Sequence, residues 1–541
     1  MKTTTVKAWL FDCIRDAGIK IVFGLPGDYN FGLCDEIETR EDLRMMHMRN
    51  ELNAGYAADG YARATGAAAM ITTYGVGDLS AVNATAGAFS ESVPLIHVVG
   101  SPDSDVLEDG KLVHHSLMNG DTDAYLRMHE PITAAAERIT AETAAETIPR
   151  LIDLALTERK PVYIEVPQDT ADAEITLTGP EEKQEVENVD SWWAADAVHK
   201  AVEEAERPVL LVDVGVSRFL QEEAVLQFSR VYQLPTYQTM QGKSAFPEDE
   251  PQYGGVYGAA FGPEYIRKQV EEADVIVTAG LLLSDFNTSK FQAELDENKR
   301  IDLQPDHTML FGERIDQALM TDVLRELGKR ESARGKVELE TPKLVKHSAK
   351  NQRLSSTVYY PILEEALPKG GILTVDTGSF SYGMPYVKLP EGCRMFSQGS
   401  WQSIGYALPA AVGAAAAEPE TPVWCMIGDG ALQLTVQELS TMHVEKMAVK
   451  IFILNNLGYA VERRLHPGRP HADYNDIPLW DYAAVTAAFA PGAVVDRAET
   501  AGELEDVLAK QVDGLHVIEL VVDDEMDVPF HLQNLSESIE E

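Results

Sequence analysis

The sequence predicts an α/β protein of three domains, each built on a parallel sheet. Short apolar segments alternate with glycine-bearing turns and helical stretches, which is the pattern of parallel strands covered by helices. The chain has 541 residues, which at roughly 150 residues per domain is enough for three or four domains. Two charged, aperiodic segments divide it into pieces of ordinary domain size.

The predicted strands form three groups along the chain. All are short and mostly apolar, as expected of strands buried on both faces of a sheet. In chain order they are Ile19–Phe23, Ala68–Thr73 and Pro94–Val99, then Pro208–Val214 and Ala273–Ala279, then Gly371–Val375, Pro422–Ile427, Val449–Leu454 and Leu515–Val522.

Two segments have the composition of linkers. Glu181–Asp190 is charged and aperiodic, and Lys329–Arg353 carries mixed charge with little apolar periodicity. Cutting the chain there predicts domains at residues 1–180, 191–340 and 354–541.

The composition excludes several classes of function. There are 87 acidic and 45 basic residues, a net charge of −42, so the surface repels nucleic acids and anionic membranes. The excess acid is explained by solubility, in a salty or acidic habitat, or by a surface for a basic partner. No apolar run reaches about 18 residues, so we expect no transmembrane helix.

The start of the chain and the cysteines predict a cytoplasmic protein. Met1–Leu10 lacks the apolar core of a secretory signal. The four cysteines are widely spaced and form no CxxC pair, so neither a disulfide framework nor a zinc cluster is expected.

The strongest motif is Gly428-Asp429-Gly430, between an apolar strand and an amphipathic helix. Glycines allow a tight turn and close approach to a ligand, and the start of the helix offers N–H groups to a phosphate. A carboxylate beside phosphate needs a bridging cation, and Mg²⁺ prefers such oxygen ligands. A simple strand–helix turn is the ordinary alternative.

A second turn strengthens this interpretation. The strand Lys450–Leu454 is followed by Asn455-Asn456-Leu457-Gly458. If the two strands are neighbours, the Asn456 amide and the Gly458 carbonyl lie near Asp429 at the same sheet edge and complete a set of three oxygens.

This pairing resembles the signature of thiamine diphosphate enzymes, in which GDG is followed by NN about one βαβ unit later. The resemblance implies thiamine diphosphate and Mg²⁺ as cofactors, with Asp429, Asn456 and Gly458 as metal ligands. The residues expected to contact the cofactor here are Gly428, Asp429, Gly430, Ala431 and Asn456.

Thiamine chemistry also needs a carboxylate that hydrogen-bonds the aminopyrimidine ring in a mostly apolar pocket. Glu51 opens a helix of small residues within Arg49–Arg63; alone, it is explained as an acid that complements the helix dipole. The run is similar to the pyrimidine-binding helix of the pyruvate and indolepyruvate decarboxylase family, which implies that Glu51 activates the cofactor.

The resemblance covers nearly the whole chain, including VFGLPGDYN from Val22, LVHHSLMNGD from Leu112 and SIGYALPAAVGAA from Ser403. It implies an N-terminal pyrimidine domain, a middle domain and a C-terminal diphosphate domain. It also implies an active site shared between subunits in a homo-oligomer, with a dimer of dimers usual in the family.

Four residues match the acid/base cluster of nonoxidative 2-oxo acid decarboxylases: Asp28, His114, His115 and Glu462. In isolation, Asp28 is explained as a turn former, the histidines as a solvated loop, and Glu462 as a partner of neighbouring arginines. The resemblance implies that together they protonate the enamine formed from the cofactor ylide after CO₂ leaves, and help to release an aldehyde. Acetolactate synthases share the fold and lack the histidine pair, and such a carboligating enzyme is the more distant alternative.

Two further residues align with positions beside the cofactor. Ile404 matches the bulky aliphatic side chain that bends the cofactor, although ordinary core packing also explains it. Gln402 stands where many relatives have glycine and where the backbone carbonyl meets the pyrimidine amine.

The small-molecule substrate is expected to be a 2-oxo acid. Ser381 occupies a position where pyruvate-specific relatives carry tryptophan, and Phe291, Val461 and Leu465 are predicted to form walls around the space it leaves. This space favours branched-chain or aromatic substrates such as 2-oxoisovalerate, phenylpyruvate or indolepyruvate. A shift of one residue would place Phe380 or Tyr382 there instead and favour pyruvate.

Overall fold

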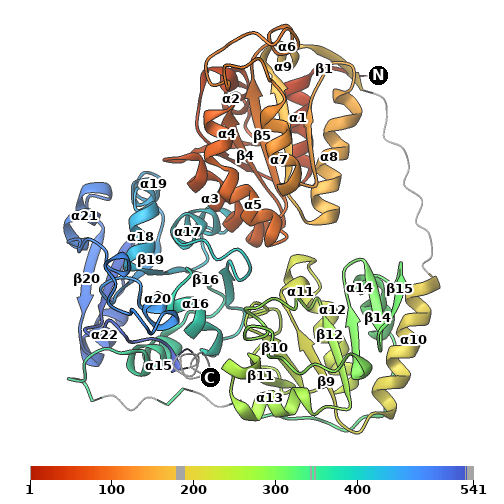
Figure 1. Cartoon of the computed structure of the whole chain (residues 1–541), viewed down its shortest axis with the longest axis vertical. Helices are drawn as coiled ribbons and strands as arrows, with labels where there is room; N and C mark the ends of the chain where they lie inside the picture. The colour runs from red at the N-terminus through yellow and green to blue at the C-terminus, as the bar shows by residue number, and fades with distance from the viewer. Residues whose placement is uncertain (1, 178–188, 342–343, 346–348, 531, 533–541) are drawn as a thin grey trace.

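The computed structural model describes residues 2–177, 189–341, 344–345, 349–530 and 532. Its larger sheets are well separated along the chain, and Figure 1 shows them as an N-terminal part at the top, a middle part and a C-terminal part below. They are called here the N-terminal, middle and C-terminal sheets. The α/β class with mainly parallel sheets is confirmed.

The N-terminal sheet has six parallel strands in the order β3-β2-β4-β5-β7-β6. Its strands are β2 (Ile21–Gly24), β3 (Arg44–His47), β4 (Ala68–Thr73), β5 (Leu95–Ser101), β6 (Ala135–Arg138) and β7 (Val162–Pro167). A separate antiparallel pair joins β1 (Lys2–Thr5) and β8 (Glu174–Leu177). The helices of this part are α1 (Val6–Asp16), α2 (Phe31–Glu38), α3 (Glu51–Thr65), α4 (Val76–Ser80), α5 (Val82–Ser90), α6 (Ser104–Glu108), α7 (Ala124–His129), α8 (Ala144–Glu158) and α9 (Gln168–Asp172).

The middle sheet has the order β11-β10-β9-β12-β13-β14-β15 and is parallel except for its last two pairings. Its strands are β9 (Pro208–Val212), β10 (Thr236–Thr239), β11 (Tyr253–Tyr257), β12 (Val275–Ala279), β13 (Arg300–Leu303), β14 (His307–Leu310) and β15 (Glu313–Asp316). Its helices are α10 (Val189–Glu204), α11 (Val214–Arg218), α12 (Glu222–Tyr232), α13 (Glu264–Glu271) and α14 (Met320–Leu327).

The C-terminal sheet is again six-stranded and parallel, in the order β17-β16-β18-β19-β21-β20. Counted from the first strand of each sheet, this order is the same as in the N-terminal sheet. Its strands are β16 (Ile372–Val375), β17 (Arg394–Ser397), β18 (Val423–Gly428), β19 (Val449–Asn455), β20 (Val494–Ala498) and β21 (His516–Val521). Its helices are α15 (Ser356–Ala366), α16 (Ser379–Gly383), α17 (Ala407–Ala417), α18 (Asp429–Thr435), α19 (Glu438–Val444), α20 (Ala460–Leu465), α21 (Tyr482–Phe489) and α22 (Ala501–Leu508).

All nine predicted strands are strands of the structure, with ends that shift by at most two residues. The predicted linker Glu181–Asp190 lies outside the described residues up to position 188, and its last two residues already begin α10. The described residues of Lys329–Arg353 contain no helix, and Arg353 forms a single bridge to Thr500. We propose that domains with the predicted boundaries surround the three sheets.

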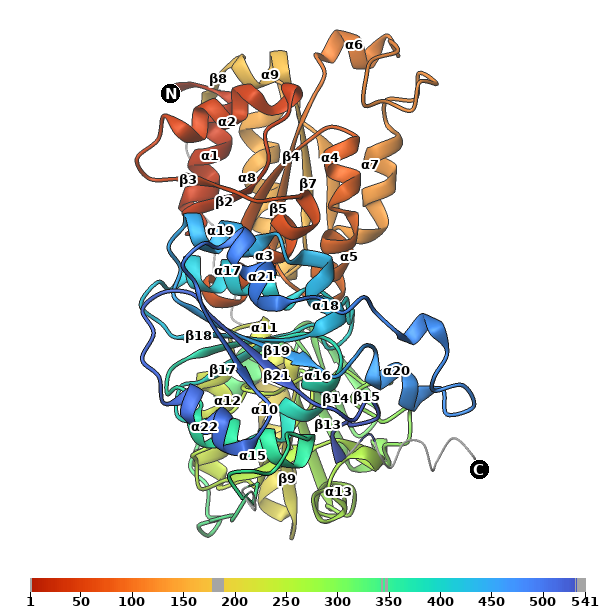
Figure 2. The same cartoon turned by 90° about the vertical axis from the view of Figure 1, so that its left-hand side faces the viewer.

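Helices α3 and α17 join the N-terminal and C-terminal parts, and both views place them side by side (Figures 1 and 2). The Asn50 side chain caps the start of α3 by accepting from the Asn53 N–H at 2.8 Å. A Cβ at Gly60 would lie 2.2 Å from the Ala410 carbonyl oxygen, and one at Gly413 would lie 1.8 Å from the Ala57 carbonyl oxygen. The two helices therefore touch backbone to backbone, which only glycine permits at these positions.

Over the described residues, no helix combines the length and the apolar character needed to cross a bilayer. Cys13, Cys34, Cys393 and Cys425 are buried free thiols.

Candidate active site

Two loops at the carboxyl edge of the N-terminal sheet bring Asp28, His114 and His115 together. Asp28 follows β2, and the histidines lie between α6 and α7. The His114 Nε2 is 2.6 Å from the Asp28 carboxylate, and the two imidazole rings meet edge to face at 4.6 Å. The structure thus assembles three of the four residues of the predicted acid/base cluster.

The surroundings of this cluster fix its histidines. The His114 ring stacks on Tyr29 at 4.8 Å, and its Nδ1 lies 3.2 Å from the Tyr29 hydroxyl. His115 has a positive φ of 65°, and its carbonyl oxygen accepts from the Tyr125 hydroxyl at 2.7 Å. A Cβ at Gly75 would lie 2.1 Å from that same oxygen, so glycine is required beneath the loop.

Glu51 is the first residue of α3 and is half-buried. Its carboxylate lies over the turn after β4, where a Cβ at Gly77 would be 3.5 Å from Oε1. Glu438 of α19 holds this end of the helix, since it accepts from the Asn53 side chain at 2.7 Å and from the Arg49 N–H at 3.1 Å. A side chain of the C-terminal part therefore holds the start of the helix that carries Glu51.

A pocket at the carboxyl edge of the C-terminal sheet contains the predicted phosphate and metal residues. Strands β18 and β19 are parallel neighbours, so the Gly-Asp-Gly and Asn-Asn turns lie side by side as expected. The predicted residues that line this pocket are Gly428, Asp429, Gly430, Ala431, Asn456 and Gly458.

Asp429 organises this edge. Its two carboxylate oxygens accept from the Gly430 N–H at 2.8 Å and the Gly458 N–H at 3.1 Å. Burial raises the pKa of Asp429 to about 6, although these backbone hydrogen bonds oppose the shift. A buried carboxylate with such a cost is stabilised by a cation, and the neighbouring Asn456 and Gly458 offer further oxygen ligands.

Gln402 and Ile404 line the same pocket. Gln402 has a positive φ of 52°, the region that glycine adopts without strain, and its side chain turns back to donate to the Gly399 carbonyl at 3.0 Å. Glutamine thus adopts here a backbone conformation that favours glycine, the residue that the resemblance leads one to expect.

Asp376 is an organising residue for which sequence analysis predicted no role. It is fully buried at the end of β16 and accepts from the Gly405 and Ala407 N–H groups, at 3.0 and 2.7 Å. It thereby fixes the backbone after Ile404. The sequence feature that could have indicated this role is an acidic residue directly after the predicted strand Gly371–Val375.

The predicted substrate walls are only partly assembled. Val461 and Leu465 of α20 line the pocket together with Glu462. Ser381 and Phe291 are absent from its lining. The Ser381 hydroxyl instead turns back onto Gly378, accepting from its N–H at 3.1 Å, and Phe291 is 75% exposed.

Phe380 and Tyr382 line the pocket on either side of Ser381. Burial, with a contribution from the charge of Glu462, raises the pKa of Tyr382 to about 12. The structure therefore has the alternative arrangement, in which Phe380 and Tyr382 face the pocket in place of Ser381. Ser381 is excluded because its hydroxyl bonds the backbone of Gly378.

The predicted site residues form two separate groups within one chain, called here the N-terminal half-site (Asp28, Glu51, His114 and His115) and the C-terminal half-site (the pocket around Asp429 and Glu462). Within this chain the pocket around Glu462 is not lined by Asp28, Glu51, His114 or His115. In both views α20 lies far from the segment after α6 that carries the histidines (Figures 1 and 2).

Comparison with known proteins identifies the family. The family descriptions "Thiamine pyrophosphate enzyme, N-terminal TPP binding domain", "central domain" and "C-terminal TPP binding domain" match residues 4–124, 195–327 and 376–520. A pyruvate decarboxylase of Aspergillus fumigatus is 35% identical over 91% of this chain and 88% of its own length. Alpha-keto-acid decarboxylases are 34% identical in Mycobacterium tuberculosis, over 96% of this chain and 94% of the relative, and in Mycobacterium leprae, over 98% and 95%.

The chain belongs to the thiamine diphosphate-dependent 2-oxo acid decarboxylases. The C-terminal half-site fits the cofactor of this family. The turn before α18 leaves open space for a ligand, since a Cβ at Gly428 would meet no atom within 4 Å. The buried Asp429 carboxylate completes an oxygen donor set for the accompanying cation.

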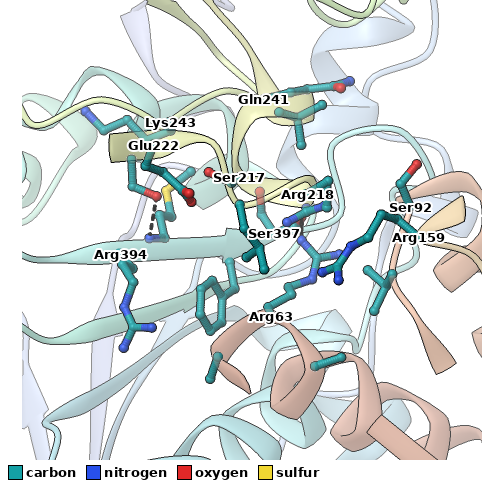
Figure 3. Close-up of a pocket in the computed structure, with 18 of the residues that line it drawn as sticks. Arg63, Ser92, Arg159, Ser217, Arg218, Glu222, Gln241, Lys243, Arg394 and Ser397 are labelled. Atoms are coloured by element: carbon teal, nitrogen blue, oxygen red, sulfur yellow. Dashed lines mark hydrogen bonds between the residues drawn. The ribbon is translucent and has the colours of Figure 1, made fainter. Parts of the chain in front are cut away.

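A second cavity, of about 150 Å³, lies where the three parts of the chain meet (Figure 3). Figure 3 shows Arg63, Arg159 and Arg218 close to one another there. Glu91 pairs with Arg63 and Arg218 at 3.6 and 3.5 Å, and also accepts from the Trp401 N–H at 3.0 Å. This cavity is lined by none of the predicted site residues; Trp401 directly precedes Gln402 of the cofactor pocket.

Proposed function

We propose that the protein catalyses the nonoxidative decarboxylation of a 2-oxo acid to an aldehyde and CO₂. The observation that carries this proposal is the Asp28–His114–His115 cluster, with its 2.6 Å contact between carboxylate and imidazole, in a thiamine diphosphate enzyme. Such a group can deliver a proton to carbon after CO₂ has left, which is the step that leads to an aldehyde.

In this proposal, thiamine diphosphate supplies the electron sink for the carbon–carbon bond that breaks. Asp429, Asn456 and the Gly458 carbonyl would hold Mg²⁺, which would neutralise the charge of the diphosphate. Glu51 would hydrogen-bond the aminopyrimidine ring, and Ile404 would pack against the cofactor. The metal contacts are supported by the oxygen donors and by the burial of Asp429 and Asn456.

We propose that a second copy of the chain completes each site. The support is that Glu51 and the histidine cluster do not line the pocket that holds Glu462 and Asp429. Each site then combines the N-terminal half-site of one subunit with the C-terminal half-site of another, in a homo-oligomer with a dimer of dimers as the expected form. The buried free thiols support a cytoplasmic location for this assembly.

The substrate walls favour the pyruvate alternative over branched-chain or aromatic acids. The prediction of a wide pocket depended on Ser381, and the lining contains Phe380 and Tyr382 instead. We propose that 2-oxo acids with short aliphatic side chains, pyruvate first, are the preferred substrates.

A panel of 2-oxo acids assayed with thiamine diphosphate and Mg²⁺ tests the reaction. We expect CO₂ and free aldehyde in equal amounts, with pyruvate turned over at least as well as phenylpyruvate. Acyloin or acetolactate as the main product would assign the protein to the carboligating enzymes instead.

Two variants test the roles within the site. Glu51→Gln should lose exchange of the cofactor C2 proton, because an amide cannot supply the same charge-assisted hydrogen bond. Glu462→Gln should keep that exchange and slow aldehyde formation by roughly 10²–10⁴. Normal turnover in both variants would overturn the proposed assignment of these residues.

A further inference from the structure

Asp28, His114 and His115 also form a set of metal-binding groups. Each offers one ligand atom, and these atoms lie within 4.8 Å of one another. We propose that this cluster is a binding site for a borderline divalent cation such as Zn²⁺, and that its occupancy inhibits the enzyme. The inhibition, unlike the binding, rests on the proposed function.

The donor types select the metal. Two imidazoles and one carboxylate are the ligands of open zinc sites, in which three protein groups leave a fourth position for water or substrate. Mg²⁺ prefers oxygen ligands and is served by the separate all-oxygen set around Asp429. The two sites therefore differ in chemistry as well as in place.

The geometry requires only local adjustment. Metal–ligand bonds of about 2.0–2.1 Å in a tetrahedron place ligand atoms roughly 3.3 Å apart. The contact between Asp28 and His114 would open from 2.6 Å, and the widest separation would close from at most 4.8 Å. Both movements are within the reach of side-chain rotation on two surface loops.

The loops already hold the ligands in orientation. The Tyr29 hydroxyl lies 3.2 Å from the His114 Nδ1 and leaves Nε2 directed at Asp28. Such an outer hydrogen bond fixes the orientation of a metal-binding imidazole. The His115 backbone is held from the other side by the Tyr125 hydroxyl and the close fit of Gly75.

The site is open to the solvent within the chain, since the side chains of His114 and Asp28 are 57% and 46% exposed. A net charge of −42 also raises the local concentration of cations around the protein. Metal binding occupies the lone pairs of the groups that are proposed to carry the proton, so proton delivery stops while the cofactor stays in its own half-site.

Zinc titration of the holoenzyme tests the proposal. The enzyme is loaded with thiamine diphosphate and saturating Mg²⁺, Zn²⁺ is added, and free metal is removed. We expect one tightly bound zinc per chain, CO₂ release that falls in proportion to occupancy, and unchanged contents of Mg²⁺ and cofactor. A zinc-selective chelator should restore activity.

Metal analysis of variants locates the ion independently of turnover. Asp28→Asn and His115→Ala should weaken zinc binding by at least about tenfold, since the first removes the negative charge of a ligand and the second removes an imidazole. His307→Ala is the matched control, because His307 at the start of β14 in the middle sheet also pairs with an aspartate, Asp306 at 2.8 Å, and this variant should bind zinc like the wild type.

Unchanged zinc retention in Asp28→Asn and His115→Ala would overturn the site. Inhibition accompanied by loss of Mg²⁺ or cofactor would show that zinc acts at Asp429, and would also overturn the proposed site. Full activity with the cluster occupied would overturn the inhibition. Failure of the proposed function gives a different result, namely no CO₂ from any 2-oxo acid before zinc is added.

Discussion

Replacing Gly413 by alanine should force α3 and α17 apart. The new Cβ would lie 1.8 Å from the Ala57 carbonyl oxygen and 2.7 Å from the Tyr61 amide nitrogen. Carbon and oxygen normally approach to roughly 3.3 Å, so the helices would have to separate by roughly 1.5 Å. Both obstructing atoms belong to the backbone, so no side chain can rotate away.

The expected cost follows from this contact. Overpacking of a core costs about 1–3 kcal/mol, and a backbone obstruction places Gly413→Ala at the upper end. The better helix propensity of alanine offsets about 0.5–1 kcal/mol, leaving about 2 kcal/mol of destabilisation. For a unit of 150–250 residues, this corresponds to a fall in Tm of about 4–8 °C.

Thermal unfolding at one fixed scan rate measures the effect, because large proteins often unfold irreversibly. Gly32→Ala is the matched control: Gly32 also lies in a helix, and no atom is within 4 Å of its Cβ position. We expect the control to unfold at or slightly above the wild-type temperature. A Gly413→Ala protein that unfolds like the control would refute the inferred backbone contact.

Three further predictions concern the site itself. Burial raises the pKa of Asp429 to about 6, so ionisation of this carboxylate destabilises the folded protein increasingly from about pH 4 to pH 6, and fully above pH 6. Without metal, Asp429→Asn should therefore be more stable than the wild type above pH 6, by up to about 3 kcal/mol, and should unfold at a higher temperature. When metal and cofactor are added, the variant should lose the cofactor on gel filtration. Stability curves of the two proteins that stay parallel over this range would contradict that account. Tyr382→Ala should raise kcat/KM for phenylpyruvate relative to pyruvate by roughly 10–100-fold, and Ser381→Ala should leave the ratio unchanged; the opposite pattern would return Ser381 to the pocket wall. Gln402→Gly should keep activity and have a Tm at or above that of the wild type, because the left-handed backbone at this position costs glutamine about 1 kcal/mol. A clear fall in Tm would show that the hydrogen bond from the Gln402 side chain to Gly399 stabilises the protein by more than this cost.

The fold and the phosphate edge of the site were predictable because both follow from local pattern. Short, mostly apolar segments define β18 and β19, and parallel neighbours must place the turns at Asp429 and Asn456 at one edge. The positions of the two motifs at the ends of neighbouring strands were therefore enough to predict that Asp429 and Asn456 lie close together.

The wall of the substrate pocket was not predictable in the same way. In a helix each residue is rotated by about 100° from the last, so a shift of one position changes which side chain points into a pocket. The Ser381 hydroxyl closes the first turn of α16 at Gly378, and this local bond turns Tyr382 toward Glu462. The separation of the two half-sites was expected from the family resemblance alone, because it depends on how whole sheets pack, which no short motif records.

The N-terminal and C-terminal sheets share one strand order, and α3 and α17 occupy equivalent places in it, each after the second strand. Their contact is reciprocal: Gly60 of α3 meets Ala410 of α17, and Gly413 of α17 meets Ala57 of α3. A single polypeptide here reproduces the self-complementary pairing of an isologous dimer, with a pseudo-twofold relation between its two ends. Gly60 and Gly413 are thus counterparts under one internal symmetry, and a change tolerated at one position should be tolerated at the other.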